Sequence, residues 1–479
     1  MCDYRSAVGD ADVMLTNKEA KINRILIAAP KSGSGKTMIT CALIRALKIR
    51  GLKVGARKCG PDYIDPMFHR KALDVESGNL DPYFTDEEML KYLLVSGCRD
   101  NDMTVIEGVM GYYDGIGGTT VEASTYDVAV KTGTPVILVV DAKGVSVTLS
   151  ALIKGMLDYR KDNNIAGVIL NRTSEGFYER IAKVIREECG IEVFGFMPEL
   201  RDLDIGSRHL GLMQPDEVEG LDVKLDMLAG QIERTVDIDG IIRTAKWAPE
   251  LSEVRPAELD GLPGSVDALK VREAKPVIAV ARDEAFGFFY DDNIRLLMEL
   301  GAEPVYFSPL HDAALPEGTD GIILYGGYPE EHAAELEGNV SMKRSILEAY
   351  KKGIPIIAEC GGFMYLQKEL ETKDGHIYEM CGVIPGRAFF ANRLVRFGYM
   401  EAKAQKPGLY GDKGLVFRGH EFHYWDCSIN GNDFKAVKPG SVVSYECMIH
   451  ESAMAAGFAH IYAYGNPKMY LEFLKKAVG

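Results

Sequence analysis

Hydrophobic and polar positions alternate along most of the chain in a way that predicts a parallel β-sheet covered by helices. Short apolar runs, each ending at glycine, proline or a polar residue, occur at residues 24–30, 53–61, 103–108, 134–142 and 165–171. Amphipathic stretches, among them residues 36–51 and 146–162, separate these runs. Strands that alternate with helices form α/β folds with helices on both faces of the sheet. Ligands of such sheets bind at the carboxyl ends of the strands.

A second series of the same kind begins at residue 276. Its apolar runs are PVIAVAR (276–282), GIILYGG (321–327) and PIIAEC (355–360). Between the two series the periodicity weakens, and the chain becomes rich in proline, glycine and acidic residues, which is typical of a linker. The pattern therefore predicts a polar, mobile leader, a first α/β domain, a linker and a second α/β domain at residues 1–22, 23–247, 248–275 and 276–479.

Composition narrows the class of protein. The chain has 479 residues, too many for one core, and a formal net charge of −15, which argues against a general nucleic-acid or anionic-membrane binder. Nine cysteines are scattered without a CxxC pair, as expected of reduced thiols in the cytoplasm. The sequence has neither a run of about 18 apolar residues nor the hydrophobic region of a signal peptide. We therefore expect a cytoplasmic protein.

A glycine-rich loop follows the first predicted strand. In APKSGSGKTMIT (29–40), Gly33, Ser34, Gly35, Lys36 and Thr37 match the end of a Walker A loop, between a strand and a helix. Glycines allow backbone N–H groups to point at phosphate oxygens, while the lysine reaches the terminal phosphates and the threonine can bind Mg²⁺. We expect an ATP site; the alternative is a turn rich in glycine and serine that binds no ligand.

Four further residues bear on this predicted site, and two of them, Lys31 and Asn171, are open to two interpretations. Pro30 replaces the first glycine of the usual motif, and Lys31 is either a second phosphate contact or, as we favour, a solvated side chain. Asn171 could bind an adenine edge or cap a loop. Asp141 ends an apolar run and is a weaker candidate for a second metal-binding carboxylate.

Acidic residues follow two more of the predicted strands. Asp62 and Asp65 come after the second, and Glu107 and Asp114 after the third. Strand ends beside a phosphate loop are where a Mg²⁺–ATP site gathers carboxylates. We expect Thr37, Asp62 and Glu107 to bind Mg²⁺, although aspartates in Gly/Pro loops also cap turns.

A single cysteine stands between an apolar run and two glycines in IPIIAECGGFMYL (354–366). Cys360 followed by Gly361 and Gly362 predicts a sharp strand-to-helix elbow, which presents a nucleophile. The helix start is expected to lower the thiol pKa, and the Gly361 N–H to donate to an oxyanion. A second donor is expected from the loop of Gly326 and Gly327. A buried, inert cysteine is the alternative.

These motifs belong to a longer series that resembles a known family. APKSGSGKT, GPDYIDPMFH, NLD, EGVMGYYDG, GVILNR and RHLGL are followed by ARDEAFGFFY, FSPLHD, GGYPEEH, ECGGFMYL and GHEFHY. In this order, over about residues 24–465, they resemble the cobyrinic acid a,c-diamide synthase family of the cobalamin pathway.

The resemblance implies a fold and a reaction. The implied fold is α/β: a P-loop, dethiobiotin synthetase-like parallel-sheet domain followed by a class I glutamine amidotransferase domain of flavodoxin-like architecture. ATP would activate a peripheral carboxylate, as an acyl phosphate, and ammonia from glutamine would displace the phosphate, once at the c and once at the a side chain. The implied partners are cobyrinic acid, ATP, L-glutamine and Mg²⁺, without nucleic acid or membrane, and a homodimer is compatible with it. The residues that match the family's functional positions are Asp62, Tyr63, Asp65, Glu107 and Asp114, with Cys360 and His460 in the amidase domain.

The histidines in the carboxyl-terminal third of the chain are the candidates for the base of the amidase site. We expect His460, in GFAHIYAYGNP near the chain end, because class I amidotransferases carry their histidine there. Two positions later, where that class has an acid, this chain has Tyr462. A backbone carbonyl, a distant carboxylate, or no third group would then orient the ring. His420, Glu421 and His423 are expected at the domain interface or glutamine pocket, or as ordinary loop residues.

Other functions stay open at this point. The same chemistry could act on metal-free hydrogenobyrinic acid or on nickel-sirohydrochlorin, or amidate other side chains as in cobyric acid formation, although GPDYIDP and RHLGL favour the a,c-diamide branch. From a different class, the chain could be a P-loop regulatory ATPase with a non-catalytic amidase-like module. Cys360 and His460 argue against that alternative.

Overall fold

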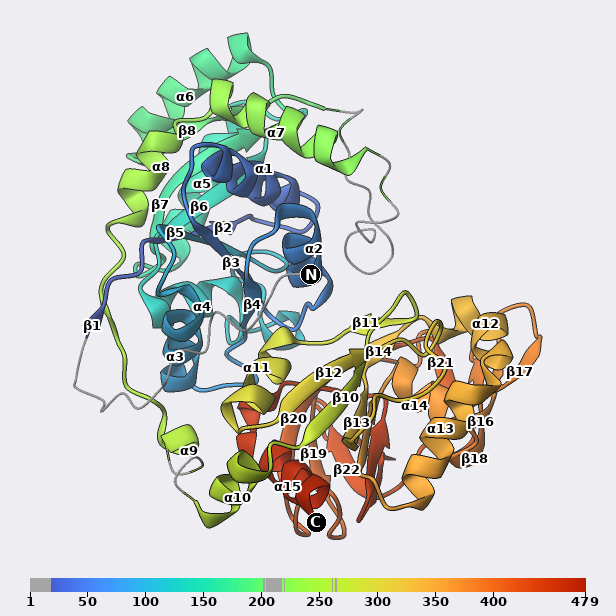
Figure 1. Cartoon of the computed structure of the whole chain (residues 1–479). Helices are drawn as coiled ribbons and strands as arrows, with labels where there is room; N and C mark the ends of the chain where they lie inside the picture. Colours follow the sequence, from blue (N-terminus) through green and yellow to red (C-terminus); the bar gives the residue numbers. More distant parts are fainter. Residues whose placement is uncertain (1–18, 201–202, 204–217, 219, 261, 263–264) are drawn as a thin grey trace.

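The computed structural model describes residues 19–200, 203, 218, 220–260, 262 and 265–479, and these form two α/β halves (Figure 1). The RHLGL motif at 208–212 and most of the predicted leader lie outside the described residues.

The amino-terminal half contains a seven-stranded parallel sheet with the strand order β4-β3-β5-β2-β6-β7-β8. Its strands are β2 (Arg24–Ala28), β3 (Val54–Cys59), β4 (Ser77–Leu80), β5 (Met103–Glu107), β6 (Val136–Asp141), β7 (Ile165–Asn171) and β8 (Glu192–Met197). Its helices are α1 (Lys36–Ile49), α2 (Ile64–Leu73), α3 (Glu87–Cys98), α4 (Thr125–Thr132), α5 (Thr148–Tyr159), α6 (Glu175–Cys189), α7 (Leu221–Thr235) and α8 (Ile238–Ala245). The predicted parallel sheet is confirmed, with β4 and β8 as strands that the apolar pattern did not indicate.

Helices cover both faces of this sheet. On β2, Ile25 and Ile27 belong to the core that also contains apolar residues of α1 and α7, whereas Leu26 and Ala28 belong to the core of α3, α4 and α5. Successive side chains of a strand point to opposite faces, so a strand buried on both faces reads as a continuous apolar run. The polar loops at the strand ends are thereby left to build the site.

The carboxyl-terminal half combines a parallel sheet with antiparallel strands. Its six-stranded sheet has the order β12-β10-β13-β15-β25-β24 and is parallel except for β24. An antiparallel sheet, β23-β22-β19-β20-β26, and a mixed sheet, β17-β16-β18-β21, lie beside it, with β11 paired to β14. The strands are β10 (Val277–Ala281), β11 (Phe286–Phe288), β12 (Glu303–Phe307), β13 (Thr319–Leu324), β14 (Gly326–Gly327), β15 (Ile356–Glu359), β16 (Gln367–Glu371), β17 (Ile377–Glu379), β18 (Ile384–Phe390), β19 (Arg396–Ala404), β20 (Val416–His423), β21 (Trp425–Cys427), β22 (Phe434–Val437), β23 (Ser444–Cys447), β24 (Ile449–Glu451), β25 (Met454–Gly457) and β26 (His460–Ile461). The helices are α11 (Asp291–Glu299), α12 (Ala333–Gly338), α13 (Val340–Lys351), α14 (Gly361–Leu366) and α15 (Pro467–Val478).

The segment predicted as a linker contains short elements of its own. These are β9 (Leu251–Ser252), α9 (Ala257–Asp260) and α10 (Val266–Ala274). Strand β9 pairs with β1 (Glu19–Ala20), so the end of the predicted leader belongs to the fold. The linker runs along one side of the molecule from the first half to the second (Figure 1).

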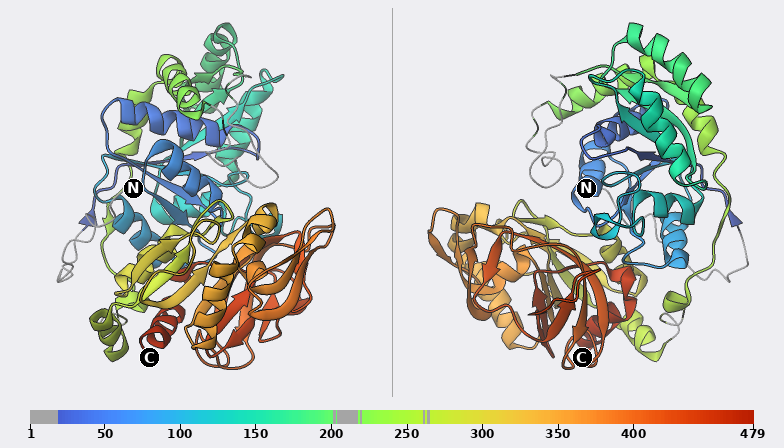
Figure 2. Two further views of the ribbon diagram at one scale, coloured as in Figure 1. Left: turned by 45° about the vertical axis from the view of Figure 1, so that its right-hand side comes forward. Right: turned by 180° about the vertical axis from the view of Figure 1, so that it is seen from behind.

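The two halves meet at the carboxyl ends of β3 and β4 (Figure 2). The hydroxyl of Tyr290 donates to the carbonyl of Pro61 at 2.9 Å. The Asn79 N–H donates to the Asp292 carboxylate, also at 2.9 Å. The ligand-binding edge of the first sheet thus faces the second half. Among the described residues, no helix is long and apolar enough to cross a membrane.

Candidate active sites

The glycine-rich loop lies between β2 and α1, as predicted. Gly33 (φ 75°) and Gly35 (φ 93°) adopt left-handed conformations, which glycine tolerates at little cost. The Lys36 ammonium donates to the carbonyl of Met110 at 2.6 Å. Burial, and then repulsion from Lys58, lowers the pKa of Lys36 to about 8. A buried lysine at the start of a helix suits an anionic ligand such as phosphate.

Two further candidates act on the shape of this loop. The Asn171 side-chain amide donates to the carbonyl of Ser34 at 2.9 Å. Asp141 accepts from Nε of Arg172 at 2.9 Å, and Arg172 in turn donates to the carbonyl of Gly33 at 3.1 Å. Asn171 therefore holds the loop backbone directly, and Asp141 holds it through Arg172.

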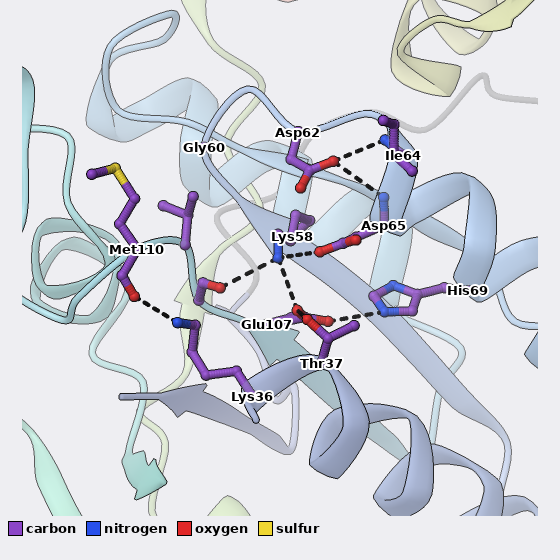
Figure 3. Close-up of polar contacts among 12 residues, drawn as sticks. Lys36, Thr37, Lys58, Gly60, Asp62, Ile64, Asp65, His69, Glu107 and Met110 are labelled. Carbon is purple, nitrogen blue, oxygen red and sulfur yellow. Dashed lines mark hydrogen bonds and ion pairs between the residues drawn. The ribbon is translucent and has the colours of Figure 1, made fainter. Parts of the chain in front are cut away.

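A buried network of charges lies next to the loop (Figure 3). Lys58, near the end of β3, donates to Asp65 at 2.5 Å and to Oε1 of Glu107 at 2.9 Å. The hydroxyl of Thr37 donates to the same Glu107 oxygen at 2.5 Å. His69 Nε2 donates to the other Glu107 oxygen at 3.2 Å. Apart from Thr37, the members of the network are at most 4% exposed; these are Lys58, Asp65, His69 and Glu107.

Neighbouring charges decide the ionisation of this network. Burial disfavours the Glu107 carboxylate, but Lys58 and His69 outweigh it and hold the pKa of Glu107 well below its usual range. Burial, and then Asp62, raise the pKa of Asp65 well above its usual range. Burial disfavours the Lys58 ammonium, but Asp65 and Glu107 raise its pKa. The charged pair at the centre is therefore Lys58 with Glu107.

Two of the three residues predicted to bind Mg²⁺, Thr37 and Glu107, are in contact. The Thr37 and Glu107 oxygens converge, which suits an ion that is usually held by one or two carboxylates and by substrate phosphates. The Asp62 carboxylate instead accepts from the backbone N–H groups of Ile64 and Asp65, at 2.9 and 3.2 Å. Within the described part of the chain, no closed cluster of three His, Cys, Asp or Glu residues forms a metal site.

The predicted synthetase residues fall into two groups. Asp65 and Glu107 lie in the buried network, whereas Asp62, Tyr63 and Asp114 line a cavity between the two halves. Asp114 also accepts from the Gly111 N–H at 3.0 Å, which holds its loop in a turn.

Two residues of the buried network, Lys58 and His69, were not among the site residues predicted from the sequence. Lys58 lies in one of the predicted strands, and His69 is the last residue of the motif GPDYIDPMFH. The available signal was a lysine two positions before the strand-ending glycine. A charged residue in a buried strand needs partners, which here are Asp65 of α2 and Glu107 of the neighbouring strand β5.

We expect Lys58→Met to lower the free energy of unfolding by about 3–5 kcal/mol, because it leaves Glu107 buried without its counter-charge. Amidation should fall with either nitrogen source. Chemical denaturation at pH 7 measures the stability, and the exposed Lys53, just before β3, provides the control variant Lys53→Met. Equal stability of the two variants would contradict the role of Lys58 as the counter-charge.

Cys360 occupies a sharp elbow between β15 and α14, as predicted. Its φ of 48° and ψ of −107° are strained for a residue with a side chain, which is typical of a nucleophile elbow. Glycines are required beside it: a Cβ at Gly362 would lie 2.1 Å from the carbonyl oxygen of Leu324. A Cβ at Gly361 would lie 2.9 Å from the backbone nitrogen of Gly327, so the two expected oxyanion donors are close together.

The expectation of a lowered thiol pKa is wrong for this structure. Burial, and then the nearby Glu330, raise the pKa of Cys360 to about 12, although the Gly361 N–H acts in the opposite direction. Helix α14 has only six residues, so its dipole is small. The thiol is therefore protonated at neutral pH.

His460, the predicted base, lies against the loop of Gly326 and Gly327, from which the second oxyanion donor is expected. A Cβ at Gly326 would lie 2.4 Å from its Cε1 atom. Pairing of β20 with β26 sets His420 opposite His460. Burial, and then repulsion from His420 and His423, lower the pKa of His460 to about 3, so the imidazole is neutral. Among the described residues, its Nδ1 atom has no hydrogen-bond partner.

The residue at the usual acidic position contacts the other half. The hydroxyl of Tyr462 donates to the carbonyl of Asn79, in β4 of the amino-terminal half, at 3.3 Å, and to Asp292 of its own half at 2.8 Å. His423 donates from Nδ1 to the carbonyl of Trp425 at 2.6 Å and lines a cavity of about 1190 Å³ beside Cys360. The same cavity contains Gly327, Glu330, Thr372 and Tyr424. Glu421 is buried, and its carboxylate accepts a hydrogen bond from the hydroxyl of Tyr445, which is a contact within the fold of this half.

One aromatic contact joins the two candidate sites. The Tyr63 hydroxyl lies 3.4 Å from Nε2 of His460, and the centres of the two rings are 4.7 Å apart. Tyr63 is the direct neighbour of Asp62 in the chain, so a residue of the synthetase loop touches the expected base of the amidase site.

Comparison with family models agrees with the two halves. Residues 25–212 match the CobQ/CobB/MinD/ParA nucleotide binding domain, and residues 277–466 match the CobB/CobQ-like glutamine amidotransferase domain. The predicted architecture is therefore confirmed.

Whole-chain relatives are also found. The chain is 39% identical to a cobyrinate a,c-diamide synthase from Caldanaerobacter subterraneus subsp. tengcongensis, over 94% of this chain and 97% of that protein. It is 39% identical to the synthase of the same name from Listeria innocua, over 94% and 98% of the two chains. The Salmonella typhimurium synthase is 40% identical over 85% and 87%.

Solved structures match single halves. A glutamine amidotransferase crystal structure covers 42% of this chain and 98% of its own, with 17% identity and a TM-score of 0.29. The MinD cell division protein of Aquifex aeolicus covers 47% of this chain and 95% of its own, with 20% identity and a TM-score of 0.28.

Proposed function

Because the chain belongs to the cobyrinate a,c-diamide synthase family, we propose that it amidates the a and c side-chain carboxylates of cobyrinic acid, using ATP and glutamine. It is a ligase of cobalamin biosynthesis with glutamine as the nitrogen donor. The observation that carries the residue-level proposal is the contact between Tyr63 and His460, which joins a phosphate-loop site to a cysteine elbow in one chain.

In the amidase half, Cys360 is the nucleophile and His460 the base. The neutral imidazole takes the thiol proton as sulfur attacks the glutamine carboxamide. The tetrahedral oxyanion accepts hydrogen bonds from the N–H groups of Gly361 and Gly327. The imidazolium then gives its proton to the departing nitrogen, so the C–N bond breaks, ammonia leaves and a glutamyl thioester forms. Water hydrolyses the thioester and regenerates the thiol.

In the synthetase half, the side-chain carboxylate attacks the γ-phosphorus of ATP, and ADP leaves. Lys36 and the loop N–H groups stabilise the transferring phosphoryl group. Thr37 and Glu107 would hold Mg²⁺ in our proposal, and the bound ion would supply neutralisation of negative charge. Ammonia then attacks the acyl phosphate, the C–O bond to the phosphate breaks, and the phosphate leaves as hydrogen phosphate with the proton that the nitrogen loses. Each cycle converts one carboxylate to one amide.

Incubation of the protein with ATP, glutamine and each candidate tetrapyrrole tests the proposal. Mass spectrometry would count the carboxylates converted to carboxamides, and we expect two for cobyrinic acid. Conversion of hydrogenobyrinic acid or nickel-sirohydrochlorin alone would redirect the substrate assignment. Sedimentation of the same sample distinguishes a monomer from the homodimer that the resemblance allows, and fractionation of the producing cells tests the predicted cytoplasmic location.

We expect Glu107→Gln to reduce amidation with either nitrogen source, whereas glutamine hydrolysis continues. The ionised Glu107 has a depressed pKa, so its contribution to stability is present above its unfolded pKa and is lost as the pH falls through its folded value. The difference in unfolding free energy between wild type and variant should therefore be largest near neutral pH and shrink below about pH 4. A pH-independent difference would argue against an ionised Glu107.

A further inference from the structure

A cavity of about 430 Å³ lies between the two halves and has walls from both. The amino-terminal half contributes Met110 and the carboxylates of Asp62 and Asp114. The carboxyl-terminal half contributes Phe397 and Lys438, from β19 and from the chain just after β22. The cavity is therefore incomplete without the amidase half.

The cavity adjoins both reaction sites. Its residue Met110 accepts a hydrogen bond from Lys36 through its carbonyl, which sets the cavity at the phosphoryl end of the glycine-rich loop. Its residue Tyr63 contacts His460 of the amidase site. A carboxylate held here would meet both the phosphoryl group and the ammonia.

The walls are mainly apolar and include exposed large side chains. Phe397 is 56% exposed and Met110 is 50% exposed, on opposite halves of the molecule. Val109 and Ile116 continue the apolar surface. An apolar slot of this kind suits the faces of a broad ring better than a small polar substrate, because large exposed apolar surface commonly marks a binding site.

Lys438 provides a positive charge on the carboxyl-terminal wall. Its ammonium donates to the carbonyl of Phe397 at 2.5 Å and lies 3.9 Å from the Glu421 carboxylate. The first contact holds the ammonium at the backbone of the residue that carries the exposed ring, so the charge and the apolar side chain belong to the same wall. Part of the lysine side chain is solvent-accessible, so a second carboxylate can approach it.

We propose that this cavity binds the tetrapyrrole and that the amidase half forms one wall of the site, with Phe397 against a face of the ring and Lys438 paired with a peripheral carboxylate. The inference rests on the proposed function and extends it: the substrate site is shared by the two halves. The ring edge that carries the reacting carboxylate then points toward Asp62 and Asp114, beside the phosphate loop.

The test uses Phe397→Ala and Lys438→Met in the full chain, with ammonium chloride as the nitrogen source. We expect the KM for cobyrinic acid to rise roughly tenfold in each variant relative to the KM for ATP, since ring contact and charge pairing each contribute on this scale. Ile377→Ala and Lys435→Met, which remove exposed side chains of the same half outside the cavity, provide matched controls with the wild-type KM.

Binding of cobyrinic acid without ATP, followed by its visible absorption, gives a second readout that does not depend on turnover. Weaker binding in both cavity variants supports the inference. If an active enzyme shows the wild-type KM and wild-type binding in both variants, the inference is overturned while the proposed function stands. If the wild type amidates no tetrapyrrole, the proposed function fails, and the binding measurement alone then decides the site.

Discussion

Replacing Cys360 by Ser should abolish amidation driven by glutamine and preserve amidation driven by ammonium chloride. The thiol already has a pKa raised to about 12, and the serine hydroxyl is a weaker acid still, so His460 cannot generate a useful nucleophile from it. Loss of a nucleophile of this kind typically lowers turnover by at least about a thousandfold. The phosphate loop lies in the other half, where the acyl phosphate is formed. The amidation step there needs only free ammonia and not the Cys360 thiol.

The measurement is the mass of the product with each nitrogen source, at alkaline pH where ammonium supplies ammonia. Cys381→Ser is the matched control, because Cys381 is also buried in the same half and its pKa is also raised to about 12, by burial. The control should keep both activities in proportion. If Cys360→Ser used glutamine at the wild-type rate, Cys360 would not be the nucleophile.

Replacing Lys36 by Ala should abolish amidation from both nitrogen sources. The variant removes the charge next to the transferring phosphoryl group, and such electrostatic contacts contribute about a hundredfold or more to the rate. Ammonia cannot bypass this step, because the carboxylate must be activated before any nitrogen attacks it.

The decisive quantity is ADP formation in the presence of a tetrapyrrole. Lys31→Ala is the control, since Lys31 is exposed on the same loop and we interpret it as solvated. We expect the control to retain most of its activity. ATP turnover at the wild-type level in Lys36→Ala would refute the assignment of the phosphate loop, and a large loss in Lys31→Ala would make that lysine a second phosphate contact.

The sequence by itself determined the features that depend on local spacing. The glycine-rich loop and the cysteine elbow are each contained in about a dozen consecutive residues, and the backbone conformations of Gly33, Gly35 and Cys360 follow from that local pattern. Buried parallel strands read as apolar runs for the same reason, so the α/β architecture was predictable. The short, polar β4 was not, because SGNL contains no apolar run and only its pairing with β3 makes it the edge strand of the sheet.

Tertiary structure decided which charged groups meet and how they ionise. Lys58 and Glu107 are 49 residues apart, and their pairing depends on the alignment of β3 with β5. Tyr63 and His460 are 397 residues apart and touch only because the two halves are docked. The pKa of Cys360 followed burial and not the helix start that the sequence suggested. Desolvation and ion pairing act through space, so a linear pattern can name such residues but cannot assign their partners.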